Sequence, residues 1–330
     1  MKLRIAIVAA LGLALALYLI LSIGWSAVLA AAVSLGWSGF AILCAYALGL
    51  FLLLGAGWSV LLPTACGAGY RVCLWARMVR DAASEVLPFS QLGGIVLGGR
   101  AAILHGLARP LAFASVIVDV TTEMLAQIAF IALGIAILSL YGPHTSFAGS
   151  LVRALEIGLA VAILAGGVFL ALQRHGHFLA EKLAARLIPG ALAATTAIGE
   201  GIDAIYRSPA RVALSAALHL AGWIVSAIGI WIAFRLIGTH VALIKVIAIE
   251  SLVCAARSLA FVVPNALGVQ EAAYAVLAPL FGVGAEVGLA VSLLKRARDI
   301  AVGVPILAIW QTVEGQRALA AATGSGDTAG

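Results

Sequence analysis

Acidic and basic side chains recur at helical spacing inside segments that are otherwise apolar. Asp119 and Glu123 lie four residues apart, so the two carboxylates would share one face of a helix. Lys295, Arg296 and Asp299 form a similar group near the other end of the chain. Because an isolated charge in the centre of a bilayer costs about 2.5–3.5 kcal/mol, buried acids need cationic partners. We therefore predict that the two acids meet this second group in the protein core, where Lys295 can also pair with Asp299.

A third group of charges, Glu250, Arg257 and Glu271, surrounds a predicted helix break. Pro264 removes a backbone donor and blocks helix continuation, and Gly268 follows it. These residues predict two apolar helical arms, 241–262 and 268–282, that meet at the break. Broken backbone beside buried charge is tolerated in a membrane where it lines a cavity or packs against protein. The segment is therefore expected to lie at the centre of the protein.

Two arginines near the predicted breaks are candidates for binding an anionic headgroup. Arg100 and Arg257 each offer a guanidinium group that can bind a phosphate with two hydrogen bonds. The alternative is that they pair with Glu85, Glu250 or Glu271. Glu271 would also open a half-helix, where exposed backbone amides favour a carboxylate, and capping alone could explain its position.

The charged residues support two interpretations, and both can hold together. They form either a structural ion-pair network that joins two halves of the chain, or a polar cavity that holds a lipid headgroup or carries protons. The candidates for the cavity are Arg100, Asp119, Glu123, Glu250, Arg257, Asn265, Glu271, Lys295, Arg296 and Asp299. The candidate hairpin breaks are Pro88, Pro264 and Gly268.

The composition places these charges in a membrane. Of the 330 residues, 64% are hydrophobic and 10% are charged, and the mean hydropathy is +1.15. These values are typical of an all-α polytopic membrane protein, here a single domain over residues 1–330. The net charge of +6 is expected to set topology, and nucleic acid is not expected as a partner. The apolar runs predict about six full spans, near 5–23, 40–62, 110–140, 151–172, 212–236 and 284–312.

Two proline-containing segments are predicted to form re-entrant hairpins instead of spans. Residues 71–107 carry several charges and are interrupted by Pro88, which would mark the tip of the first hairpin. Two ordinary tilted helices are the alternative. Residues 241–282 would form the second hairpin. Between the two, the polar stretch 174–208 is expected to lie at the cytoplasmic membrane interface.

Basic residues gather on one side of this map. Segments 24–37, 141–150 and 238–240 hold no Lys or Arg, in contrast to the basic segments on the opposite side. By the positive-inside rule, both termini are predicted to be cytoplasmic. The first hairpin would then enter from the cytoplasm and the second from outside.

Residue pairs separated by 176 positions indicate an internal repeat. The pairs are Pro88 with Pro264, Asp119 with Lys295, and Glu123 with Asp299. Three spans separate the hairpins, so the repeat halves, approximately 40–140 and 210–313, would have inverted orientations. Inverted repeats with broken helices near the midplane are typical of transporters.

Several motifs resemble those of one known family. They are LPFSQLGG at 87–94, GGR at 98–100, DVTTEM at 119–124, ARSLAFVVPNALGVQE at 256–271 and SLLKRARD at 292–299. Together they resemble the lysylphosphatidylglycerol synthase transmembrane-region family, a flippase-like integral membrane group, over nearly the whole chain. Within it, the sequence is most similar to the hopanoid-biosynthesis-associated HpnL branch. The resemblance implies a bacterial inner (cytoplasmic) membrane protein that handles lipid.

The expected function follows from this resemblance. No stretch is polar enough to fold as the soluble aminoacyl-transferase domain of the synthase members, so lipid aminoacylation is not expected. No nucleophile elbow, nucleotide loop or metal signature occurs, so we expect no enzyme activity, cofactor or metal. We predict that the protein moves an amphiphilic lipid across the membrane. This lipid would be a hopanoid, a lipid-linked precursor or an anionic lipid. The alternatives are a non-transporting accessory of lipid-biosynthesis enzymes and a membrane-embedded lipid transferase; a homodimer is also considered.

Overall fold

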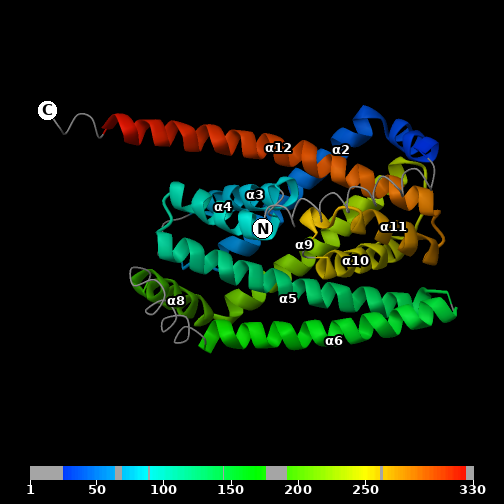
Figure 1. The fold of residues 1–330 in the computed structure, drawn as a ribbon, viewed down its shortest axis with the longest axis horizontal. Helices are drawn as coiled ribbons and strands as arrows, with labels where there is room; N and C mark the ends of the chain where they lie inside the picture. Colours follow the sequence, from blue (N-terminus) through cyan, green and yellow to red (C-terminus); the bar gives the residue numbers. More distant parts are fainter. Residues whose placement is uncertain are drawn as a thin grey trace.

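The fold is known from a computed structural model, which describes residues 25–63, 69–87, 90–143, 145–175, 192–260 and 263–324. Within these ranges every regular element is a helix (Figure 1). This confirms the all-α, multi-pass membrane architecture. The elements are α2 (Trp25–Ser59), α3 (Tyr70–Val86), α4 (Ser90–Leu104), α5 (Arg109–Tyr141), α6 (Ser146–His175), α8 (Leu192–Tyr206), α9 (Pro209–Leu236), α10 (Leu243–Leu259), η3 (Pro264–Ala266), α11 (Val269–Leu280) and α12 (Ala285–Gly324).

Four helices in the described part of the chain are long and apolar enough to cross a membrane. They are Val33–Ser59, Arg109–Tyr141, Ser146–Arg174 and Pro209–Leu236, and each corresponds to one of the predicted spans. The predicted span at 5–23 lies outside the described residues, as do residues 176–191 of the predicted interfacial segment. The last predicted span lies within α12, whose length of 40 residues is ample but whose charges keep it out of this group.

The first predicted hairpin consists of α3 and α4, which pack against each other. At about 1.5 Å per residue, the 17 residues of α3 and the 15 of α4 give lengths of about 25 Å and 22 Å. Each is therefore shorter than a bilayer's hydrocarbon core of about 30 Å. Between them α3 ends at Val86, with Leu87 as its C-cap. Pro88 lies outside the described residues, so its role as the tip stays a prediction.

Glycine allows the close approach of α3 and α4. A Cβ atom added at Gly94 would lie 2.6 Å from the backbone oxygen of Arg80 and 2.1 Å from the hydroxyl of Ser84. A Cβ at Gly98 would lie 2.8 Å from the Cβ of Arg80. Small residues of this kind let membrane helices pack backbone to backbone. These glycines therefore allow α4 to lie directly against the part of α3 that carries Arg80 and Ser84.

The second hairpin contains the predicted break. Helix α10 ends at Leu259, the short 3-10 helix η3 begins at Pro264, and α11 begins at Val269. Asn265 and Ala266 have positive φ angles of 50° and 46°, and Gly268 has a φ of 79°. Residues with side chains rarely adopt these angles, so the backbone here departs fully from a helix. The predicted arms and their interruption are thus confirmed.

The two hairpins lie toward opposite ends of the molecule, and the long helices α5, α6 and α12 run along both (Figure 1). Helix α3 packs against α12, and α10 packs against α5, so each hairpin contacts a long helix from the other part of the chain. Helices α2 and α9 pack against each other as well. Two large apolar cores result, one around each hairpin. The charged residues described below lie at the contacts between these elements.

Candidate functional site

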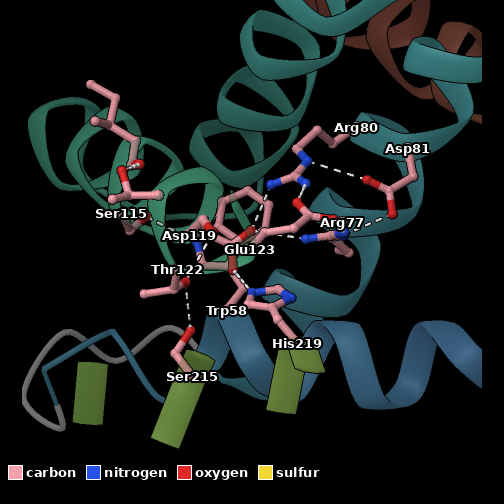
Figure 2. Close-up of polar contacts among 12 residues, drawn as sticks. Trp58, Arg77, Arg80, Asp81, Ser115, Asp119, Thr122, Glu123, Ser215 and His219 are labelled. Atoms are coloured by element: carbon pink, nitrogen blue, oxygen red, sulfur yellow. Dashed lines mark hydrogen bonds and ion pairs between the residues drawn. The ribbon is translucent and has the colours of Figure 1, made fainter. Parts of the chain in front are cut away.

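Six charged or titratable residues form a buried group between α3, α5 and α9, which we call the α3–α5 cluster. Its members are Arg77, Arg80, Asp81, Asp119, Glu123 and His219 (Figure 2). Arg77 and Arg80 are three residues apart on α3, so both side chains leave the helix on one face. Asp119 and Glu123 leave the facing side of α5 at a spacing of four.

Two arginines and two acids in this cluster share four ion pairs. Arg77 donates to Asp119 Oδ2 at 3.0 Å and to Glu123 Oε1 at 2.6 Å. Arg80 donates to Asp119 Oδ2 at 2.6 Å and also to Glu123. Asp81 accepts hydrogen bonds from the Nε atoms of both arginines, at 2.8 Å and 3.2 Å. Arg77 and Asp119 are almost completely buried. Such charges are stable only when each is paired and hydrogen-bonded.

His219 of α9 completes the cluster. Its Nε2 atom lies 2.9 Å from Asp119 Oδ1, and its side chain is fully buried. Its Nδ1 atom has no hydrogen-bond partner among the described residues. Nearby, Thr122 of α5 and Ser215 of α9 are hydrogen-bonded at 3.0 Å. These contacts hold α9 against α5 through polar groups inside the protein (Figure 2).

The predicted partners of Asp119 and Glu123 were wrong. The sequence predicted that they would meet the Lys295–Asp299 group, but their cations are Arg77 and Arg80 of the first hairpin. The reason is that α3 packs against α4, and α4 against α5, so long side chains of α3 reach α5, whereas α12, which carries Lys295, packs mainly against α2, α3 and α11. The spacing of Arg77 and Arg80 was the signal that could have identified them.

A second buried group, the α10–α12 cluster, consists of Glu250, Glu271, Tyr274, Lys295 and Arg296. Lys295 donates to Glu250 Oε2 at 2.6 Å, and the Tyr274 hydroxyl donates to the same carboxylate. Arg296 donates to Glu271 Oε1 at 2.8 Å. The cluster therefore joins α10 and α11 to α12.

Glu271 also caps α11, as predicted. Its Oε2 atom accepts a hydrogen bond of 2.8 Å from the backbone N–H of Gly268, directly at the start of the helix. The same carboxylate binds Arg296, so capping is only part of its role. Lys295, in contrast, does not pair with Asp299 as predicted. Asp299 is bound by its neighbour Arg298 at 2.6 Å, because Lys295 is held by Glu250.

The two hairpins meet where each helix pair is interrupted. Arg257 of α10 donates to Glu85 Oε1 of α3 at 2.9 Å. Asn265 donates from its side-chain amide to the backbone oxygen of Glu85 at 2.6 Å, and its own side-chain oxygen accepts from Arg257 at 3.3 Å. Arg296 reaches the backbone oxygen of Asn265 at 3.4 Å. We call this group, formed by Glu85, Arg257 and Asn265, the hairpin junction.

Arg257 forms one of the two contacts that the sequence analysis considered for it. The pairing with Glu85, which was the alternative to a free headgroup-binding arginine, is present. Arg257 is about a quarter exposed and Glu85 about a third, so the pair is the least enclosed of the central ion pairs. A ligand could therefore exchange with this pair more readily than with Arg77 or Asp119.

A small cleft lies beside the junction, between α2, α3 and α12. Its volume is about 50 Å³, and three acids, Asp81, Glu85 and Asp299, line it together with apolar residues. The apolar part of its wall consists of Ala47, Phe51, Ala82, Val302 and Gly303. The cleft thus links one member of the α3–α5 cluster to one member of the junction. Carboxylates beside an apolar wall can receive a proton or a cationic group.

The two clusters resemble each other with the signs of charge exchanged. In the first hairpin, Arg77 of α3 pairs with Asp119 of the long helix that follows. In the second, Glu250 of α10 pairs with Lys295 of the long helix that follows. Arg77 and Glu250 are 173 positions apart, and Asp119 and Lys295 are 176 apart. The buried pair therefore occupies the same place in each set of helices.

Arg100 lies apart from the central charges. It is more than half exposed and pairs with Glu314 near the end of α12. The structure thus places Arg100 away from the other predicted cavity residues, and it brings five further residues into contact with them that were not among those candidates. These are Arg77, Arg80, Glu85, His219 and Tyr274. Two of them, His219 and Tyr274, lie in largely apolar helices, and their partners come from other helices.

Among the described residues, no group of three or more His, Cys, Asp or Glu side chains could hold a metal ion.

Comparison with known proteins gives one result, at the level of the family. No curated protein and no solved structure matches the chain. Residues 3–306 match the family model described as Lysylphosphatidylglycerol synthase TM region. Because this match covers nearly the whole chain, the protein belongs to the family of the lysylphosphatidylglycerol synthase transmembrane region.

Proposed function

We propose that the protein moves an amphiphilic lipid between the leaflets of a membrane and is not itself an enzyme. Membership of a family of lipid-handling membrane proteins supports the lipid as the substrate class. The observation that carries the proposal is the hairpin junction, where Arg257 and Asn265 of one hairpin bind Glu85 of the other. Here polar groups from both ends of the molecule meet inside an apolar protein. The sequence motifs favour a hopanoid or a lipid-linked precursor as the lipid.

The proposed route runs past the junction and the acidic cleft. A polar headgroup that leaves water must find partners, because unpaired polar groups are costly in hydrocarbon. The pair of Arg257 and Glu85 offers one group of each sign, and the pair is partly exposed. An anionic part of a headgroup would bind Arg257, while a cationic or hydroxyl part would bind Glu85. The lipid tails would remain in the bilayer beside the protein.

Inverted repeats would give this route two equivalent ends. We propose that the order α2, α3, α4, α5 is repeated by α9, α10, α11, α12 with the opposite orientation in the membrane. The charge-exchanged pairs Arg77–Asp119 and Glu250–Lys295 support this arrangement. Each hairpin would then be reached from a different side. The termini would lie in the cytoplasm of a bacterium, as the positive-inside rule indicates.

The test is an assay of leaflet exchange in vesicles. The full chain is reconstituted in phosphatidylcholine–phosphatidylglycerol vesicles with a trace of fluorescent phosphatidylglycerol, and a membrane-impermeant reductant quenches the outer leaflet. We expect the wild type to expose the inner probe, and Arg257→Ala to slow this exposure by about tenfold, the equivalent of one charged hydrogen bond. Arg153→Ala, which removes an exposed charge from α6, is the matched control and should exchange like the wild type.

The same assay separates the alternatives. A non-transporting accessory would give vesicles that quench no further than protein-free vesicles. A lipid transferase would produce a chemically changed lipid, which mass spectrometry of the vesicle extract would detect. Exchange by Arg257→Ala at the wild-type rate would remove the junction from the route.

A further inference from the structure

A pocket separate from the central charges lies between α4 and α5. Its volume is about 390 Å³, which is within the range of about 300–1,000 Å³ typical of ligand sites. It is lined by Val96, Arg100, Ile103, Leu104, Arg109 and Phe113. None of these residues belongs to the α3–α5 cluster, the α10–α12 cluster or the hairpin junction.

The two arginines of this pocket have unused hydrogen-bonding capacity. Arg109 is exposed and has no side-chain hydrogen bond or ion pair with any described residue. Arg100 uses Nε and one terminal nitrogen to bind Oε1 of Glu314, and its other terminal nitrogen has no such bond in the described part of the chain. The Oε2 atom of Glu314 is buried and also lacks a partner there. The charge of this pocket is therefore only partly compensated.

The rest of the lining is apolar. Val96, Ile103 and Leu104 come from α4, and Phe113 comes from α5. The phenyl ring of Phe113 lies against Gly99, where an added Cβ would be 2.9 Å from the ring. An apolar wall next to two guanidinium groups matches a molecule with an anionic head and a hydrocarbon tail.

The position of the pocket identifies the source of such a molecule. It lies where α4 ends and α5 begins, toward the same end of the molecule as α8 (Figure 1). Arg174 at the end of α6 and Arg207 before α9 belong to turns at this end. Basic residues at helix ends mark the side of a membrane protein that faces anionic lipid in the cytoplasmic leaflet. Basic pockets between membrane helices on that side bind lipid headgroups.

We infer that the pocket between α4 and α5 binds the phosphate of an anionic phospholipid through Arg100 and Arg109, with an acyl chain along Val96, Ile103, Leu104 and Phe113. The carboxylate of Glu314 competes with this phosphate for Arg100. The site does not depend on the proposed lipid movement, because it involves none of the residues on that route. It would connect the lipid composition of one leaflet to the ion pair between Arg100 of α4 and Glu314 of α12.

The test measures binding by the purified full chain in an uncharged detergent. Isothermal titration calorimetry is performed with dioctanoyl phosphatidylglycerol, dioctanoyl phosphatidylcholine and inorganic phosphate. We expect the anionic lipid to bind most tightly, since only it supplies both a net negative charge and a tail. Arg100→Ala and Arg109→Gln should each weaken its binding about tenfold, the equivalent of one charged hydrogen bond. Glu314→Gln should bind about fivefold more tightly, because a competing negative charge is lost.

The control and the contrary outcomes are equally specific. Arg207→Gln removes an exposed charge at the same end of the molecule but outside the pocket, and should bind like the wild type. Equal binding of phosphatidylcholine would overturn the role of the arginines, and equal binding of inorganic phosphate would overturn the role of the apolar wall. Unchanged affinity in both arginine variants would exclude this pocket as the site.

Discussion

Asp119 accepts hydrogen bonds from Arg77 and Arg80 and contacts His219, so three elements of the fold depend on one carboxylate. The four ion pairs that Asp119 and Glu123 form with the two arginines compensate charges that would otherwise be costly in a low-dielectric interior. The pair of Arg257 and Glu85 differs, since both of its side chains are partly exposed. Residues in the first group are therefore expected to control stability, and those in the second to control transport.

Removal of the Asp119 charge should destabilise the protein strongly. Asp119→Asn leaves two buried arginines with a single remaining acid on α5, and breaking a buried ion pair costs about 3–5 kcal/mol. The measurement is thermal unfolding of the purified protein in detergent. Asp203→Asn, at an exposed position of α8, is the matched control and should melt like the wild type. Equal melting temperatures for both variants would contradict the burial of this network.

Charge reversal should separate structure from transport at the hairpin junction. Glu85→Arg and Arg257→Glu alone place like charges together, so each variant should unfold at a lower temperature than the wild type. The double variant restores opposite charges and should recover much of this loss. If Arg257 also binds a headgroup, leaflet exchange should remain slow in the double variant. Full recovery of exchange would show that only the attraction between the hairpins matters.

At the scale of elements, the breaks and the close contacts follow from glycine and proline. Helix α10 ends before Pro264, at which η3 begins, and α11 starts directly after Gly268, whose φ of 79° suits glycine. The approach of α4 to α3 depends on Gly94, because the backbone of Arg80 lies where a side chain would be. The position of the α3–α5 cluster therefore depends on a residue that carries no charge.

Substitution of Gly94 should loosen the first hairpin. Gly94→Ala places a methyl group 2.6 Å from a backbone oxygen, and overpacking of this kind costs about 1–3 kcal/mol. We expect a lower unfolding temperature and weaker protection of α3 amides in hydrogen exchange. Gly158→Ala is the control on α6, where an added Cβ meets no atom within 4 Å. Unchanged protection of α3 in the Gly94 variant would argue against close packing of the hairpin.

Particular residues show how far the sequence could predict these elements. The apolar runs and Pro264 predicted the spans and the second hairpin, because composition and backbone chemistry act locally. The partners of Asp119 could not be predicted in the same way. A buried acid in the sequence indicates that a cationic partner exists, but not which helix supplies it. Arg77 and Lys295 were equally suitable partners of Asp119 by charge. The choice depends on how α3, α4 and α5 pack together and on where α12 lies, which involve contacts far apart in the sequence.

At the scale of the whole molecule, orientation in the membrane is the main prediction still to be measured. Tyr141 and Ala108 are exposed positions at the two ends of α5, a helix that is long enough to span the bilayer. In intact cells, a membrane-impermeant maleimide should label Tyr141→Cys but not Ala108→Cys, because basic residues keep the second end inside. Permeabilised cells should show labelling of both. The reverse pattern would invert the map and place the anionic-lipid pocket in the outer leaflet.

The hairpin junction has a consequence for how such a protein can move. Asn265 and Arg257 both bind Glu85, so movement of the η3 turn together with the end of α10 would release both contacts. The long helices α5, α6 and α12 would not need to separate, since their apolar packing lies elsewhere. Opening would then be a local rearrangement at the hairpin junction, which breaks far fewer helix contacts than rotation of one half of the bundle against the other.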